Sequence, residues 1–170
     1  LSPSSAASDV YKRQGKDTIY DLASLTKVVV TTPLIVKALE EGLLSLSDRV
    51  VDHLTWFKGY NREKIRIWHL LTHSSGLPAW LPFYSICKSR EELVHFLSSS
   101  HLISPIFEPG TKILYSDIGF ILLGFIIEEI YGKSLDQVYR EKIADPLGLK
   151  NTYFNPPREL RERIAATEYC

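Results

Sequence analysis

Apolar side chains recur at intervals of three and four residues in several parts of the chain after residue 14. This spacing places them on one face of an α-helix, so it predicts four longer helices. These are residues 26–41, 89–98, 117–131 and 134–144. Gly42 and Gly132 follow the first and third of them, where a glycine commonly ends a helix. Ser89 and Glu92 form an S-x-x-E capping box at the start of the second helix.

Breaks in this pattern predict the rest of the secondary structure. Pro33 lies inside the first helix, and we expect it to kink that helix because proline has no N–H to donate. Residues 65–71 have helical spacing and connect neighbouring elements, whereas extended pieces are predicted only near residues 16–20 and 111–114. Apolar helices need a second layer to cover them. We therefore expect that sheet strands belonging to this domain are missing from both ends of the sequence.

Composition narrows the class of protein. The 170 residues are 45% hydrophobic and 24% charged, which is sufficient to bury a core. Twenty Lys and Arg balance twenty Asp and Glu, so nucleic acid is not an expected partner. The longest apolar run, residues 118–127, has half of the roughly 20 residues that a membrane-spanning helix needs. The two cysteines, Cys87 and Cys170, are too few for a disulfide framework.

The first fourteen residues differ from the rest. Residues 1–8 are small and polar, and Asp9-Val-Tyr-Lys-Arg-Gln14 back-translates to GAT GTG TAT AAG AGA CAG, which resembles the transposon end used to build sequencing libraries. Methionine is absent from the sequence, position 1 included. We therefore predict that residues 1–14 are a technical scar, that residues 15–170 form one partial domain, and that the chain is a fragment.

Candidate chemistry begins at Ser24-Leu-Thr-Lys27, where the chain enters the first long helix. Residues three apart share a helix face, so the Ser24 hydroxyl and the Lys27 amine can meet. A serine becomes a nucleophile when a neighbour accepts its proton, and lysine can do so if its pKa falls from about 10.4. Burial and a helix N-terminus both lower that pKa. The N–H groups of the same helix end can bind a developing oxyanion.

Other interpretations of these residue types remain open. Ser24 can simply cap the helix, and a chain of this composition contains about one S-x-x-K by chance. Ser85-Ile-Cys-Lys88 is a second occurrence, in a predicted loop. Tyr115 precedes the third helix; a phenol near an ammonium ionises more easily and can act as general base and acid, although most tyrosines only pack their rings. Tyr153 begins a Tyr-x-Asn match in a predicted surface turn.

The histidines do not indicate a metal site. His69 and His73 are four residues apart, but no Glu follows His69 as an H-E-x-x-H zinc site requires. We expect His73, shortly before Gly76, to hold a turn through its ring nitrogens. A Gly-rich phosphate loop is also absent from the sequence. We therefore predict neither a metal nor a cofactor.

Three segments in this order resemble one family: Leu22-Ala-Ser-Leu-Thr-Lys27, His69-Leu-Leu-Thr-His-Ser-Ser-Gly-Leu77 and Tyr115-Ser-Asp-Ile-Gly-Phe-Ile-Leu-Leu-Gly124. The chain is similar to the serine β-lactamase-like proteins, in the branch of class C β-lactamases, D-alanyl-D-alanine carboxypeptidases and esterases. Phe107-Glu-Pro-Gly110 and Asp145-Pro-Leu-Gly-Leu149 also look like this family. The resemblance implies an α+β fold, with an antiparallel sheet flanked by helices. In this chain most of that sheet would be missing, leaving a mostly α-helical fragment.

The resemblance also implies roles for particular residues. Ser24 would be the acylated nucleophile, Lys27 its proton partner, and Tyr115 the second base and the acid for the leaving group. The Ser24 N–H would supply half of the oxyanion hole. Its other half, and a third motif of Lys or His, any residue, Gly, would lie beyond Cys170.

Asp117 departs from the pattern of the penicillin-binding members, which usually carry Asn there. That amide helps to hold the acylamino group of a β-lactam or peptide, and an ionised Asp cannot donate in the same way. If Asp117 points inward, it also stabilises Lys27 as a cation. Asp117 therefore argues against β-lactamase activity more strongly than against serine acyl transfer in general.

These observations favour a serine acyl hydrolase that forms an acyl-enzyme at Ser24 and acts on a small ester, an amide or a D-amino-acid peptide. Asp117 and the unseen third motif motivate an alternative, a catalytically inactive module that recognises peptide or peptidoglycan. A further possibility is that the fragment by itself does not fold, because its apolar helical faces would have no partner layer.

Overall fold

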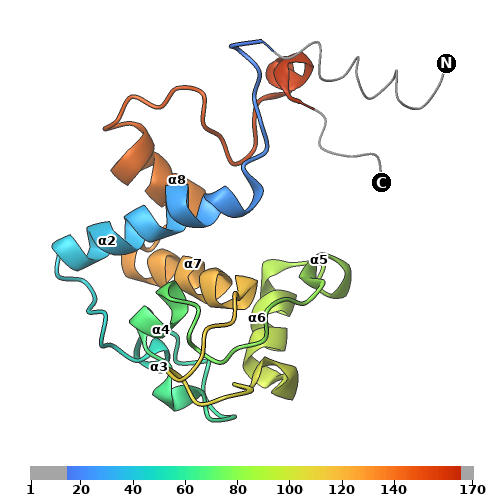
Figure 1. Cartoon of the computed structure of the whole chain (residues 1–170). Helices are drawn as coiled ribbons and strands as arrows, with labels where there is room; N and C mark the ends of the chain where they lie inside the picture. The colour runs from blue at the N-terminus through green and yellow to red at the C-terminus, as the bar shows by residue number, and fades with distance from the viewer. Residues whose placement is uncertain (1–14, 166–170) are drawn as a thin grey trace.

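The computed structural model describes residues 15–165, so the prediction about residues 1–14 lies outside the described residues. The helices cross one another at several angles around a central one (Figure 1). In chain order they are η1 (Ala23–Leu25), η2 (Lys27–Thr31), α2 (Thr32–Glu40), α3 (Val50–His53), η3 (Arg62–Lys64), α4 (Ile67–Leu71), α5 (Phe83–Ile86), α6 (Arg90–Ser99), η4 (His101–Ile103), α7 (Asp117–Tyr131), α8 (Leu135–Tyr139), η5 (Arg140–Ala144) and η6 (Arg158–Arg163).

The four long helices predicted from the hydrophobic spacing are confirmed. α7 has the predicted bounds, and Gly132 follows it with φ +63°. The capping box is present in part, since the Ser89 hydroxyl accepts from the Glu92 N–H at the start of α6. The segment predicted at 134–144 forms α8 and the π-helical η5. Local sequence therefore determines where these helices begin and end.

The first long helix differs from a regular kinked helix. It begins with the π-helical η2, in which the Thr32 N–H donates to the Lys27 carbonyl five residues back, and continues as α2 with Pro33 in its first turn. Wider π turns are rare and occur often at functional sites. The helix is thus disturbed near Pro33, as expected, and the disturbance is a π-helical segment just before the proline.

Strands are almost absent from residues 15–165. Only two isolated bridges occur there: Ile19 pairs with Ile164 in parallel, and Arg49 pairs with Arg66 in antiparallel. The expectation of an extended piece at residues 16–20 is met by that single bridge. Residues 111–114 form no strand or bridge, and their Leu114 N–H donates to the carbonyl of His73.

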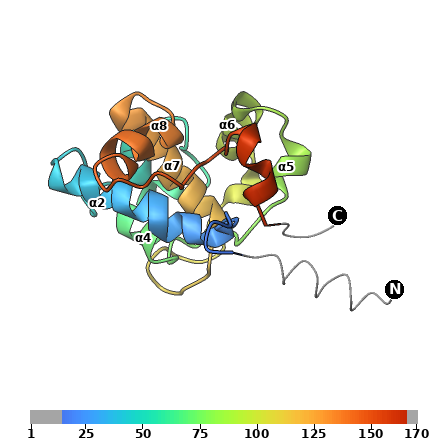
Figure 2. The ribbon, with the colours of Figure 1, turned by 90° about the horizontal axis from the view of Figure 1, so that it is seen from above.

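α7 forms the centre of the core. It contacts η2, α2, α3, α4 and α8, and it lies between the layer of α2 and α8 and the layer of α3 and α4 (Figure 1). In the view from above, α5 and α6 lie on the other side of the molecule from α2 and α8 (Figure 2). Most of its side chains are buried, including Ile118, Leu122 and Ile126. Within the described residues, no helix is both long and apolar enough to cross a bilayer.

A buried arginine joins two parts of this structure. Arg62 is fully buried and donates to three carbonyls at the C-terminal end of α6, those of Leu97, Ser98 and Ser100, at 2.6–3.0 Å. Its guanidinium also lies over the rings of Phe57 and Tyr60. The Leu97 and Ser98 carbonyls lie at the end of α6, where the helix offers no further N–H, and Arg62 supplies the donor. The Ser100 carbonyl also accepts from the Ile103 N–H of η4 at 3.3 Å.

Candidate active site

Ser24 lies in a tight turn at the N-terminal end of the first long helix. The preceding Ala23 has φ +42°, and its N–H donates to Oδ1 of Asp21 at 2.8 Å. Non-glycine residues rarely adopt this conformation, and such strain is concentrated at functional sites. Ser24 is thereby exposed within η1, shortly before η2 begins.

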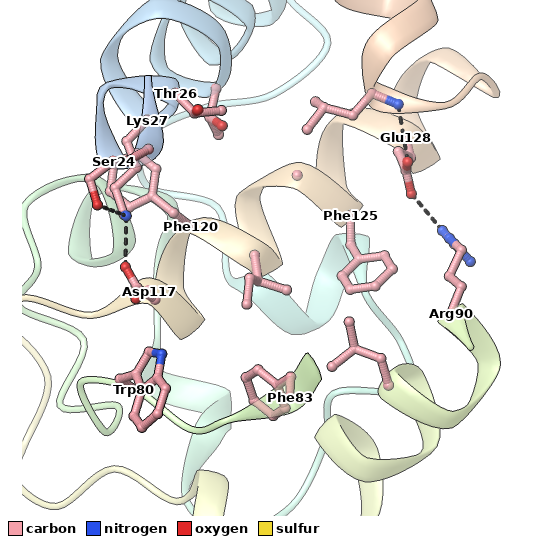
Figure 3. A pocket seen from close by; sticks show the side chains of 16 residues that line it. Ser24, Thr26, Lys27, Trp80, Phe83, Arg90, Asp117, Phe120, Phe125 and Glu128 are labelled. Carbon is pink, nitrogen blue, oxygen red and sulfur yellow. Dashed lines mark hydrogen bonds and ion pairs between the residues drawn. The ribbon is translucent and has the colours of Figure 1, made fainter. Parts of the chain in front are cut away.

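Lys27 lies one turn further along the same face, as its spacing predicts. Its Nζ donates to Ser24 Oγ at 3.3 Å and is 2.7 Å from Oδ1 of Asp117 (Figure 3). Burial by itself lowers the pKa of Lys27, but the interactions with Asp117 and Tyr115 outweigh burial, and the pKa ends above its usual value. The side chain that was expected to become a neutral base is therefore held as a cation.

Asp117 is the first residue of α7, and it points inward. Its position is fixed from both sides: its own N–H donates to the carbonyl of Ala79 at 2.8 Å, and the hydroxyl of the preceding Ser116 accepts from Gly119 N–H and donates to the Pro78 carbonyl. The conditional expectation that Asp117 reaches Lys27 is thereby confirmed. The structure supplies the contact that sequence alone left open.

Tyr115 is on the loop before α7 and is half exposed. The Nζ of Lys27 is 4.9 Å from the centre of its ring. Hydrogen bonding to Lys27, and then to Ser24, lowers the pKa of the Tyr115 phenol, while its slight burial and the charge of Asp117 oppose the change. The four predicted site residues thus lie together, and among them the phenol is the group shifted toward its basic form.

The other serine, tyrosine and histidine considered from the sequence bond to nearby backbone groups. Ser85 Oγ donates to the Pro82 carbonyl at 2.9 Å, and Tyr153 OH donates to the Lys150 carbonyl at 2.7 Å. His69 is buried, and its Nδ1 accepts from the Arg66 N–H at 2.9 Å. These three side chains make local structural contacts.

A cavity of about 640 Å³ extends from this cluster along α7. Ser24, Lys27 and Asp117 lie at one end, and an ion pair between Arg90 and Glu128, at 2.7 Å, lies at the other (Figure 3). Four aromatic side chains line the space between them: Trp80, Phe83, Phe120 and Phe125. The sequence interpretation missed these residues. Those of α7 follow its helical spacing, but no local motif marks Trp80 or Phe83.

Comparison with known proteins identifies the family of this chain. The family model described as Beta-lactamase matches residues 7–170. A Bacillus subtilis protein named "N-acetylmuramyl-L-alanine amidase" is 34% identical over 166 residues, 89% of this chain and 37% of that protein. An Escherichia coli K12 protein named "Putative D-alanyl-D-alanine carboxypeptidase" is 36% identical over 168 residues, 89% of this chain and 38% of that protein.

Solved structures give the same result. A class C beta-lactamase aligns with a TM-score of 0.77 and 26% identity, covering 89% of this chain and 41% of that one. The octameric penicillin-binding protein homologue from Pyrococcus abyssi aligns with a TM-score of 0.74 and 32% identity, covering 89% and 36%. The chain thus spans about two fifths of the length of these proteins, and the structural neighbours have the serine β-lactamase/DD-peptidase fold. From its family match, its relatives and its structural neighbours, this chain belongs to the beta-lactamase family of serine β-lactamases and penicillin-binding proteins.

Proposed function

We propose that the protein is a serine hydrolase that forms an acyl-enzyme at Ser24. The observation that carries this proposal is the chain of contacts from Ser24 Oγ to Lys27 Nζ and on to Asp117, beside a tyrosine with a lowered pKa. An activated nucleophile requires a neighbour that accepts its proton. In this site the Tyr115 phenolate is better suited to that role than the Lys27 ammonium.

The proposed reaction has two halves. In the first, the Ser24 oxygen attacks the acyl carbon, its proton passes to the phenolate of Tyr115, and the resulting phenol gives that proton to the leaving alcohol or amine. In the second, Tyr115 takes a proton from the water that attacks the ester of Ser24. The phenol then returns this proton to Ser24 Oγ as the acid leaves, which restores the hydroxyl and the phenolate. Lys27 stays protonated throughout, holding Ser24 in place and stabilising the phenolate. The Ser24 N–H is assigned half of the oxyanion hole.

We assign the substrate to small esters, amides or D-amino-acid peptides. Relatives named amidase and D-alanyl-D-alanine carboxypeptidase support this class. Asp117 argues against efficient β-lactam hydrolysis, since its carboxylate is engaged by Lys27 and has no N–H to offer an acylamino group. An ester or amide substrate that has no acylamino group does not need this N–H, so Asp in place of Asn weakens its binding less.

The test is covalent labelling of the full-length protein with a fluorophosphonate, followed by mapping of the modified peptide. We expect one label on Ser24, and none in Ser24→Ala. Ser85→Ala, at the second S-x-x-K, is the matched control and is expected to label normally. Label that persists in Ser24→Ala would overturn the proposal.

The same site allows a second function, an inactive module that binds peptide or peptidoglycan. The Lys27–Asp117 ion pair favours it to the extent that a permanently protonated lysine is a poor base. Turnover of a p-nitrophenyl ester separates the two functions. A hydrolase turns the ester over and loses most of that activity in Lys27→Ala, whereas a binding module gives no turnover in either form.

A further inference from the structure

His73 is connected to both neighbours of Tyr115. It lies in the turn after α4 with φ +55°. Its backbone carbonyl accepts from the Leu114 N–H at 2.8 Å, and its ring Nδ1 accepts from the Ser116 N–H at 3.0 Å. The ring nitrogen that was expected to hold a local turn therefore bonds to a loop about forty residues away. Through these two contacts, His73 fixes the backbone on both sides of Tyr115.

The ring of His73 also contacts the phenol itself. The two ring centres are 4.4 Å apart with an angle of 33° between the planes, and the ring of Phe120 lies 5.1 Å from that of His73. Stacked aromatic rings restrict each other's orientation and add stabilisation beyond the area they bury. The backbone and the side chain of Tyr115 are thus both held by His73.

We infer that neutral His73 is a positioning residue for the reaction, holding the Tyr115 phenol within reach of Ser24. This inference rests on the proposed function for its chemical meaning. A general base contributes only when its accepting atom is correctly placed, and small displacements of such a group are costly to the rate. His73 acts through Tyr115 and takes no part in the proton transfers.

The contact with Ser116 requires an unprotonated Nδ1, since a doubly protonated imidazole has no acceptor. Three groups near the ring influence its charge. Burial and then the Lys27 ammonium lower the pKa of His73, while the Asp117 carboxylate opposes them. The third group, Tyr115, faces the ring at a tilt. Acid that does protonate His73 breaks the Ser116 contact and places a second cation beside the phenol.

His73→Asn is the informative variant. The Oδ1 of Asn can stand where Nδ1 stands, and Asn tolerates positive φ, but it has neither the stacking ring nor a titrating group. We expect the rate constant for fluorophosphonate labelling to fall about ten-fold at pH 7, less than the 10²–10⁴ that a general base contributes. The exposed His101→Asn is the control and is expected to label at the unaltered rate.

The pH profile distinguishes positioning from a purely structural role. Where Tyr115 is the base, the logarithm of the labelling rate falls with a slope of about one on the acid side, as one proton is taken up. In the unaltered protein we expect this slope to steepen toward two as His73 also takes up a proton. In His73→Asn it should remain near one. Parallel profiles for the two proteins would overturn the inference while Ser24 labelling, and with it the proposed function, still stands.

A second readout does not depend on activity. In protein labelled with ¹³C at tyrosine Cζ, and with the signal assigned by Tyr115→Phe, the Tyr115 resonance should move as His73 titrates and lose that movement in His73→Asn. A Tyr115 signal that ignores the His73 titration overturns the inference. If Ser24→Ala still labels, the proposed function fails instead, and this titration alone decides whether His73 controls Tyr115.

Discussion

Asp117 determines the charge of the residue beside the nucleophile. Its carboxylate is 2.7 Å from Lys27 Nζ and raises the pKa of that lysine against the effect of burial. In Asp117→Asn the burial remains and the opposite charge is lost, so the pKa of Lys27 should fall. The new amide also supplies an N–H donor at the same place. Both changes move the site toward the arrangement that the penicillin-binding members usually have.

We therefore expect Asp117→Asn to increase β-lactam acylation relative to ester acylation by about ten-fold, a change equal to roughly 1.4 kcal/mol in the barrier. The measurement is kcat/KM for nitrocefin divided by kcat/KM for p-nitrophenyl acetate in the full-length protein. The exposed Asp136→Asn on α8 is the control. An unchanged ratio would contradict the assignment of Asp117 as the residue that disfavours β-lactams.

Tyr115 should give the activity its pH dependence. Its pKa is lowered from 10.0, and the phenolate is the active form, so acylation should rise with pH with a midpoint below pH 10. Lys27→Gln removes the ammonium that contributes most to this lowering, and the midpoint should move to higher pH. The labelling rate as a function of pH measures the shift. A midpoint that stays in place would show that Tyr115 is not the base.

At the scale of the elements, Arg62 connects α6 to the chain before α4. Its guanidinium is fully buried and donates to three carbonyls at the end of α6. We expect Arg62→Met to lower the free energy of unfolding by about 3 kcal/mol, because the Leu97 and Ser98 carbonyls lose their donor. Urea denaturation measures the loss. The exposed Arg158→Met on η6 should change it by less than about 0.5 kcal/mol.

Gly76 allows two loops to approach each other. Its φ is +77°, and a Cβ there would be 2.3 Å from the Phe107 carbonyl oxygen, while Ile106 N–H donates to the Gly76 carbonyl at 2.8 Å. Gly76→Ala should therefore cost about 3 kcal/mol or more, through the clash in addition to the strain. Gly42 has φ +69° with nothing near its missing Cβ. Gly42→Ala should cost only the strain, about 1 kcal/mol. Equal losses in thermal or urea unfolding would argue against the clash.

For the whole molecule, the main feature is an apolar face without a partner in the described structure. Leu25, Val28 and Val36, on η1, η2 and α2, are 46–60% exposed, although they belong to the first long helix, whose other side is in the core. Exposed apolar side chains gathered on one part of a surface promote association and dye binding. We expect the 170-residue chain to bind 8-anilinonaphthalene-1-sulfonate, and Val28→Lys to reduce that binding without lowering the melting temperature. A lower melting temperature in Val28→Lys would indicate that this face is packed.

The sequence determined the features that depend on neighbouring residues. Helical spacing, a capping serine and a C-terminal glycine specify local backbone structure, and this is why the bounds of α7 were predictable. The S-x-x-K spacing placed Ser24 and Lys27 on one helix face for the same reason. The family resemblance was also contained in short ordered motifs, and comparison with known proteins confirmed it.

Only the tertiary structure decided what these groups can do. Lys27 is held as a cation because α7 brings Asp117 to it from 90 positions away, and the aromatic cavity forms where α5, α6 and α7 meet the first helix. His73 turns from a loop residue into a support for Tyr115 by the same long-range packing. Charge, burial and stacking depend on distances in space, and these distances are set by how the helices pack together.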